Sequence, residues 1–349
     1  MIRKVALFIL FASFGSPFLI TLSATSLDSL GSFPHEDVRL THGNTQVAGT
    51  LWKPKSKRPF PVVIFIHGDG PRDRSFSGYY NAIFQAFLQI GVGCLSWDKP
   101  GVGQSTSPYG PYQRDKPQSF YQRSGELRKA IDYLKARSDI DPEQIGCWGI
   151  SQAGWIMPMV AAQSPDIRFI IAVTCPAQSA IIQSDYATRL RLMASGISED
   201  SIKRVLAYEQ AENKLLPNPH PSMAFWQFLA GKPNRWPEQY ARSADDDGSF
   251  LIDPLPYWRT IRCPVLAIFA QNDQNVNPTV SADLYRNTLR QDSDVTIKTF
   301  ENADHLVFSS LTGLDKEWRQ HLDNKEYPYA PGYTSLQVNW LKKHIRSKR

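Results

Sequence analysis

Short runs that are mostly apolar are the feature that most constrains the fold of this chain. A strand can be apolar on both faces only if both faces are covered, as in a mostly parallel sheet between helices. Such runs occupy residues 61–67, 92–98, 144–150, 169–175, 265–270 and 295–300. Stretches with helical spacing alternate with them at residues 79–89, 120–137, 152–163 and 336–345. The sequence therefore predicts an α/β fold with a mostly parallel central sheet flanked by helices.

This alternation is interrupted once, between about Pro176 and Trp258. The interrupting stretch is helical and polar-aromatic in pattern, and it contains no convincing strand. Because it falls between two predicted strands, we expect an insertion that forms a helical cap over their carboxyl ends. The expected organisation is a core of residues 27–175 and 259–349 with a helical cap of residues 176–258.

The N-terminus has the pattern of an export signal. Two basic residues precede an apolar stretch, residues 5–22, and small residues follow it. We expect residues 1–26 to be a cleaved signal peptide, so that the mature protein is exported to the periplasm or the medium without stable membrane insertion. An uncleaved anchor through residues 5–22 is the alternative, which Gly15 and Pro17 within the stretch disfavour.

Charge and cysteine content exclude several classes of partner. The formal net charge is +6, but five of the basic residues stand among the last eight, without interleaved aromatic residues. A solvated basic tail explains this better than a nucleic-acid site. The four cysteines each fall in or beside an apolar run, and none has metal-ligand spacing. We expect buried free thiols, no metal, no cofactor and no nucleic-acid partner.

A candidate nucleophile follows the predicted strand 144–150. Ser151 stands there within the sequence GISQAG, residues 149–154. Small residues two positions on either side of a serine permit a tight strand-to-helix turn that exposes its hydroxyl. Ala153 departs from this pattern, because it stands where the second glycine is usual.

A serine hydroxyl becomes a good nucleophile when a histidine, oriented by a carboxylate, takes its proton. His305 follows the last predicted strand, and Asp273 follows the strand before it. Because the carboxyl ends of parallel strands meet at one edge of a sheet, we expect both to lie near Ser151. Asp304 is poorly placed to orient the ring of its neighbour, and His321 follows no predicted strand. The chain order serine, aspartate, histidine is that of α/β-hydrolases.

The glycine-rich sequence HGDGPRDR, residues 67–74, follows the first of the predicted parallel strands. Its backbone can supply donors to the oxyanion of a tetrahedral intermediate. We expect the backbone amides of Asp69 and Gln152 to be those donors. Asp69, Arg72 and Asp73 are expected to form an ion-paired loop that holds the turn.

On these residues the chain resembles the α/β-hydrolase superfamily, and most of all bacterial capped esterases and acyl hydrolases with a His-Gly-x-Gly-x-x-Asp-Arg loop. The sequence DKPGVGQS, residues 98–105, is similar to the structural turn of that family. The resemblance covers about residues 37–345. It implies a serine hydrolase that cleaves small carboxylic esters or other acyl substrates through an acyl-enzyme. An aminopeptidase or acyl thioesterase on the same triad is the alternative, and a non-catalytic binding protein of the same fold is a third reading.

Overall fold

The computed structural model describes residues 27–43, 45–106, 120–213, 252–289 and 294–345. The predicted signal peptide or anchor and residues 214–251 of the predicted cap lie outside these ranges, and both assignments stay predictions. Within the described ranges, every helix is too short or too polar to cross a bilayer.

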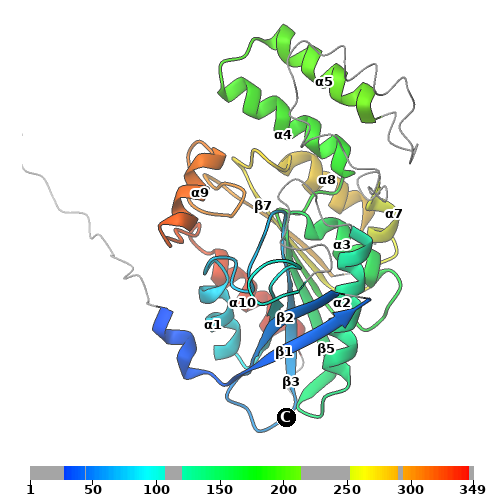
Figure 1. Cartoon of the computed structure of the whole chain (residues 1–349), viewed down its shortest axis with the longest axis vertical. Coiled ribbons are helices and arrows are strands. Elements are labelled where there is room, and N and C mark those ends of the chain that lie inside the picture. The colour runs from blue at the N-terminus through cyan, green and yellow to red at the C-terminus, as the bar shows by residue number, and fades with distance from the viewer. Residues whose placement is uncertain (1–26, 44, 107–119, 214–251, 290–293, 346–349) are drawn as a thin grey trace, which may run out of the picture.

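An eight-stranded, mostly parallel sheet forms the centre of the molecule (Figure 1). Its strand order is β1-β2-β4-β3-β5-β6-β7-β8. β2 runs antiparallel to both of its neighbours, and every other pair is parallel. The strands are β1 (His35–His42), β2 (Thr45–Trp52), β3 (Phe60–Ile66), β4 (Gly93–Trp97), β5 (Ile140–Ile150), β6 (Ile170–Val173), β7 (Val265–Ala270) and β8 (Val295–Phe300). The predicted mostly parallel α/β architecture is confirmed.

Helices cover both faces of this sheet, which explains why inner strands such as β3 and β7 are apolar along their length. Along β3, Val63 and Phe65 pack into one hydrophobic core, whereas Val62 and Ile64 pack into the other. The first core includes side chains of α1 (Asn81–Gln89) and α10 (Tyr333–His344). The second core includes side chains of α2 (Phe120–Lys135), α3 (Ala153–Ala161) and α8 (Pro278–Thr288). A short 3-10 helix η1 (Leu27–Ser32) and helix α9 (Asp315–Asp323) add side chains to the first core, through Leu30 and through Trp318 and Leu322.

In the described part of the predicted cap, residues 176–213 and 252–258, three further helices occur. They are α4 (Ala180–Ala194), α5 (Glu199–Asn213) and α7 (Leu255–Trp258). Figure 1 shows α4 and α5 standing beyond the end of the sheet. Helix α4 is tied to the core through two donors, since the Gln183 side chain donates to the Asn275 carbonyl and the Tyr186 hydroxyl donates to the Asp273 carbonyl at 2.9 Å. The assignment of residues 176–258 as a cap stays a prediction.

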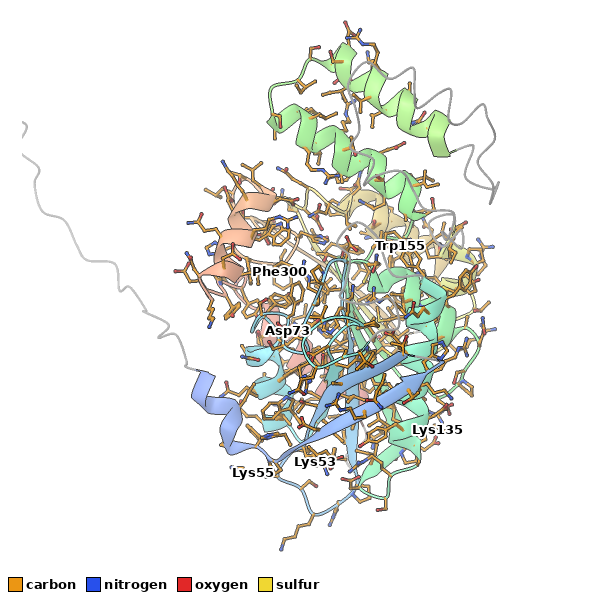
Figure 2. The ribbon with its side chains drawn as sticks, viewed as in Figure 1. Lys53, Lys55, Asp73, Lys135, Trp155 and Phe300 are labelled. Atoms are coloured by element: carbon orange, nitrogen blue, oxygen red, sulfur yellow. The ribbon has the colours of Figure 1, made fainter. Side chains whose placement is uncertain are left out.

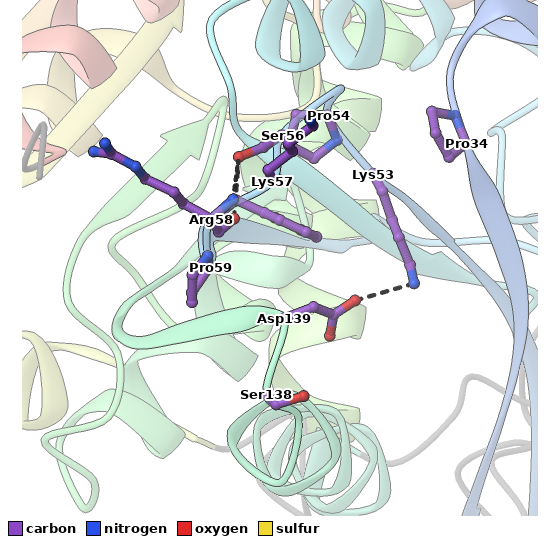
Figure 3. A pocket seen from close by; sticks show the side chains of 10 residues that line it. Pro34, Lys53, Pro54, Ser56, Lys57, Arg58, Pro59, Ser138 and Asp139 are labelled. Atoms are coloured by element: carbon purple, nitrogen blue, oxygen red, sulfur yellow. Dashed lines mark hydrogen bonds and ion pairs between the residues drawn. The ribbon is translucent and has the colours of Figure 1, made fainter.

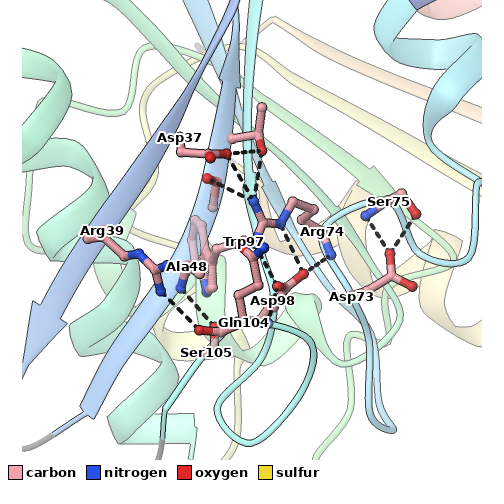
Figure 4. Close-up of polar contacts among 12 residues, drawn as sticks. Asp37, Arg39, Ala48, Asp73, Arg74, Ser75, Trp97, Asp98, Gln104 and Ser105 are labelled. Atoms are coloured by element: carbon pink, nitrogen blue, oxygen red, sulfur yellow. Dashed lines mark hydrogen bonds and ion pairs between the residues drawn. The ribbon is translucent and has the colours of Figure 1, made fainter.

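An ion pair joins the loop after β3 to the turn after β4 (Figure 4). Nε and one terminal nitrogen of Arg74 donate to the two carboxylate oxygens of Asp98 at 3.1 and 2.8 Å. The other terminal nitrogen donates to the Gly49 carbonyl and the Thr50 hydroxyl on β2, at 3.2 and 3.0 Å. One guanidinium thus connects the glycine-rich loop, the turn after β4 and strand β2.

One ion pair of the loop lies outside the expected set of Asp69, Arg72 and Asp73. The ion pair that holds the loop reaches outside it, to Asp98, and is formed by Arg74. Arg72 donates through Nε to the Asp69 carbonyl at 2.9 Å. The Asp73 carboxylate accepts from the Ser75 amide at 2.7 Å and caps the following turn.

We expect Arg74→Met to lower the free energy of unfolding by about 3 kcal/mol or more, because it leaves the Asp98 carboxylate buried without its counter-charge. The Asp98 side chain is only 4% exposed. The control is Arg286→Met, which breaks an exposed pair with Asp283 on α8 and should cost less than about 1 kcal/mol. Urea unfolding at pH 7 measures both. Equal losses in the two variants would contradict the structural role of Arg74.

Candidate active site

Three polar side chains follow strands at the same edge of the sheet. The sequence predicts that they lie close together. Ser151 directly follows β5, Asp273 follows β7 and His305 follows β8. These strands stand in the order β5-β6-β7-β8 and run parallel. Their carboxyl ends therefore bring all three residues to one edge, where open α/β sheets bind their ligands.

The turn between β5 and α3 holds Ser151 in a left-handed conformation, with φ of +55°. A non-glycine residue in this region is strained, which is the geometry expected for a nucleophile at a strand-to-helix turn. The Ser151 amide donates to the Val173 carbonyl at 3.0 Å and so fixes the turn against β6. A side chain at Gly149 would place its Cβ 2.6 Å from the Cβ of Ala153. Gly149 thus makes room for the methyl group by which Ala153 departs from the usual pattern.

Two other glycines let neighbouring segments approach the serine turn. A Cβ at Gly68 would lie 3.1 Å from the Cβ of Ser151, so the loop after β3 packs directly against the candidate nucleophile. A Cβ at Gly154 would lie 2.8 Å from the Cβ of Cys175, so the first turn of α3 packs against the chain leaving β6. Both approaches are possible because glycine has no side chain.

His305 and Asp273 form a buried pair. Nδ1 of His305 lies 2.8 Å from Oδ2 of Asp273, and the two residues are 7% and 2% exposed. The other carboxylate oxygen accepts from the amides of Asn275 and Val276 at 2.7 and 2.9 Å, which fixes its orientation. Burial lowers the pKa of His305, but the Asp273 carboxylate outweighs it, and the net pKa lies above the usual 6.5. With Nδ1 bonded to Asp273, Nε2 is left to exchange a proton with a substrate or nucleophile.

The end of β6 connects the histidine and serine segments. The Thr174 hydroxyl donates to the His305 carbonyl at 3.0 Å, while the carbonyl of the preceding residue, Val173, accepts from the Ser151 amide. Thr174 also has a positive φ of +43°. Thr174 belongs to no catalytic motif in the sequence. Its one signal is a hydroxyl side chain directly after an apolar strand.

The competing residues are used elsewhere. Oδ1 of Asp304 accepts from the Leu306 and Phe308 amides at 2.9 and 3.1 Å, so this carboxylate caps its own turn. Burial raises the pKa of Asp304 to about 6. His321 on α9 lies 3.2 Å from Glu326, away from the strand ends. Asp273 is thus the acid whose carboxylate contacts the His305 ring.

Cationic side chains hold the backbone of the glycine-rich loop. Arg123 donates to the His67 carbonyl at 2.5 Å, and Nζ of Lys99 donates to the Gly68 carbonyl at 2.7 Å. Nε of Arg72 donates to the Asp69 carbonyl at 2.9 Å. Among the described residues, the backbone amides of Asp69 and Gln152 donate no hydrogen bond. These amides are the two predicted oxyanion donors, and both N–H groups are thus available to a ligand.

His67, although it opens the glycine-rich loop, is a structural residue. Its Nε2 lies 2.6 Å from the Trp97 carbonyl and its Nδ1 lies 2.9 Å from the Tyr80 hydroxyl. Burial lowers the pKa of His67 to about 3, so the ring is neutral. The neutral ring donates to the carbonyl and accepts from the tyrosine, which anchors the start of the loop.

A hollow of about 410 Å³ lies at the opposite end of the sheet (Figure 3). It is bounded by the chain entering β3 and the chain entering β5, and Lys53 crosses it to reach Asp139 at 3.0 Å. Figure 2 shows Lys53 and Lys55 at this end and Trp155 at the other. The hollow therefore lies at the amino ends of parallel strands and is separate from the serine, aspartate and histidine.

Metal-ligand geometry is missing from the part of the chain that the structure describes, which holds no cluster of three His, Cys, Asp or Glu side chains suited to a metal ion. All four cysteines are free thiols. Cys94, Cys147 and Cys175 are buried, and Cys263 is partly buried.

Comparison with known proteins agrees with the fold. Residues 63–311 match the profile of the Alpha/beta hydrolase family. The chain belongs to the alpha/beta hydrolase family. This confirms the predicted superfamily and supports a hydrolytic enzyme. Esterase Pf2001 of Pyrococcus furiosus has the same fold, with a TM-score of 0.56 and 15% identity over 92% of this chain and 94% of the esterase.

Two curated relatives of this alpha/beta hydrolase extend over most of the chain. An uncharacterized 31.7 kDa protein of Escherichia coli, from the traX-finO intergenic region, is 22% identical over 335 residues, which cover 88% of this chain and 99% of the relative. Esterase EstD of Thermotoga maritima is 20% identical over 302 residues, which cover 84% of this chain and 66% of the esterase.

We expect Gly149→Ala to destabilise the serine turn, because the new methyl group would lie 2.6 Å from both the Ala153 Cβ and the Met157 Cε. Overpacking of this kind costs about 1–3 kcal/mol. Gly31→Ala is the matched control, because its Cβ would meet no atom within 4 Å. Urea unfolding compares the two proteins. A Gly149 variant as stable as the Gly31 variant would show that α3 can move away without cost.

Proposed function

We propose that this alpha/beta hydrolase cleaves carboxylic esters through an acyl-enzyme on Ser151, with His305 as general base and Asp273 orienting the histidine. The observation that carries the proposal is the buried Asp273–His305 pair, 2.8 Å apart, at the strand edge where Ser151 stands in its strained turn. The esterases among the similar proteins support an ester as the substrate.

The reaction begins when the Ser151 hydroxyl gives its proton to Nε2 of His305. Oγ then forms a bond to the ester carbonyl carbon, and the carbonyl oxygen becomes an oxyanion that the Asp69 and Gln152 amides stabilise. His305 returns the proton to the departing alkoxide as the carbon–oxygen bond breaks. A water molecule repeats the sequence on the acyl-enzyme, which releases the carboxylic acid and restores Ser151.

Asp273 supports both proton transfers. Its carboxylate holds the ring through Nδ1 and stabilises the imidazolium that forms when Nε2 takes the proton. The two backbone amides that bond its other oxygen keep it in place while the charge on the ring changes. The carboxylate itself stays ionised.

Ser151→Ala should lower kcat by about 10⁴-fold or more without changing the fold, because the acyl-enzyme can no longer form. The measurement is hydrolysis of a p-nitrophenyl butyrate substrate, together with labelling by a fluorophosphonate probe. Ser335→Ala is the control, since Ser335 is an exposed serine on α10 whose hydroxyl bonds the Gly332 carbonyl. Activity of Ser151→Ala within tenfold of the native protein would overturn the assignment.

The leaving group separates an esterase from the two alternatives on the same triad. The native protein is assayed on a butyryl ester, a butyryl thioester and alanine p-nitroanilide. The proposal expects the largest kcat/KM on the ester. A larger value on the thioester or the anilide would make the protein a thioesterase or an aminopeptidase, with the role of Ser151 unchanged.

The acid limb of the kcat/KM profile should have its midpoint above pH 6.5. Only neutral His305 can accept the serine proton, and Asp273 raises the pKa of that ring, so activity is lost as pH falls through the raised pKa. In Asp273→Asn the burial of the ring remains but the carboxylate charge is gone. The limb should then move to lower pH, with kcat reduced by about 10⁴-fold. An acid limb at the same pH in both proteins would point to another base.

A further inference from the structure

Arg123 reaches two separate parts of the candidate site from helix α2. One terminal nitrogen donates to the His67 carbonyl at 2.5 Å, and the other donates to the side-chain oxygen of Gln152. His67 begins the loop after β3, whereas Gln152 follows Ser151 in the turn between β5 and α3. The arginine is 4% exposed, so this bridge lies out of contact with bulk water.

The side chains of the two candidate donor residues are also joined. Nε2 of Gln152 donates to Oδ1 of Asp69 at 3.2 Å. Gln152 therefore uses both ends of its amide group, accepting from Arg123 and donating to Asp69. The two backbone amides predicted to face an oxyanion belong to residues whose side chains form one hydrogen-bonded chain.

Lys99 fixes the direction of one of those amides. The peptide bond is planar and trans, so the Gly68 carbonyl and the Asp69 N–H point in opposite directions from the same plane. Nζ of Lys99 donates to that carbonyl at 2.7 Å, and the lysine is 1% exposed. Holding the carbonyl on one side thus fixes the Asp69 donor on the other.

This arrangement costs electrostatic energy that a structural contact would avoid. Burial lowers the pKa of Lys99 well below its usual value, and the charge of Arg123 lowers it further. The carboxylates of Asp69 and Glu126 raise the pKa of Lys99 in part, and Glu126 is itself 2% exposed, with a pKa that burial raises. Burying two like charges near each other is costly, and strongly perturbed groups of this kind cluster at functional sites.

We propose that Arg123 and Lys99 form a cationic clamp that positions the oxyanion hole, Arg123 by setting the spacing between Asp69 and Gln152 and Lys99 by orienting the Asp69 amide. Both are positioning residues, because they act on the substrate through other groups. The clamp rests on the proposed serine hydrolase function and extends it. The clamp acts on the transition state, because donors aimed at a developing charge accelerate the reaction when they are held in place beforehand.

The test compares Arg123→Met and Gln152→Leu with Arg128→Met. Gln152→Leu removes the acceptor of Arg123 but keeps the backbone amide. Arg128 is the matched control, because it lies on the same helix and donates to the side-chain oxygen of Gln163 at 2.7 Å, away from the strand ends. Each variant is measured for kcat and KM on a butyryl ester, for inhibition by a trifluoromethyl ketone that forms a tetrahedral adduct, and for its pH profile.

We expect Arg123→Met to lower kcat by about 10²-fold, comparable to the loss of one oxyanion donor. KM should stay within threefold, the inhibition constant of the ketone should rise in parallel with the loss in kcat/KM, and the acid limb should not move, because the His305–Asp273 pair is untouched. Arg123→Lys, which can keep one of the two bonds, should recover part of the rate. Arg128→Met should keep the native rate.

Folding does not decide the result. If Arg123→Met fails to fold, Gln152→Leu and Arg123→Lys carry the same comparison, and Lys99→Met tests the other arm. Native kcat in the folded variants, with Ser151→Ala inactive, would overturn the clamp and leave the serine mechanism standing. An active Ser151→Ala would instead overturn the proposed function itself. A fall in kcat accompanied by a shifted acid limb would assign Arg123 to the histidine and contradict the clamp.

Discussion

The parallel pairing of β5, β6, β7 and β8 is the constraint on which the candidate site depends. Ile150 lies opposite Val173 in the register of β5 with β6, and Val173 lies opposite Ile268 on β7. Each strand therefore ends at about the same level of the sheet, and the residues that follow it lie at one edge. The chemistry of the edge follows from which side chains occupy those positions, because the hydrogen-bond ladder has already brought them together.

Much of the fold and the strand-end residues could be predicted because burial on both faces leaves a direct mark in the sequence. Continuous apolar runs predicted the strands and hence the edge where Ser151, Asp273 and His305 stand. The strand β5 begins at Ile140 rather than at residue 144, because its first residues include Asp141 and break the apolar pattern where the pairing with β3 shifts register. Helices α8 and α9 were missed, since their exposed positions make their sequences polar.

The supporting side chains could not be predicted, because their partners are backbone groups far away in the sequence. Arg123 looks like any arginine on an amphipathic helix, and only the folded chain shows that it meets the His67 carbonyl. Lys99 lies in a turn that predicts loop structure, yet it is buried against Gly68. Arg74 and Asp98 each belong to a recognisable sequence, but nothing in either sequence predicts that the two residues pair. Charged residues in a sequence usually indicate exposed positions, and these residues are exceptions.

The hydrogen bonds from α4 to the loop after β7 have a consequence for the histidine pair. The Tyr186 hydroxyl and the Gln183 side chain both end on carbonyls of the segment that carries Asp273. An insertion or deletion that rotates α4 would withdraw both donors from that segment and loosen the carboxylate that holds His305. The position of α4 and the position of the Asp273 carboxylate that bonds His305 are thus mechanically coupled.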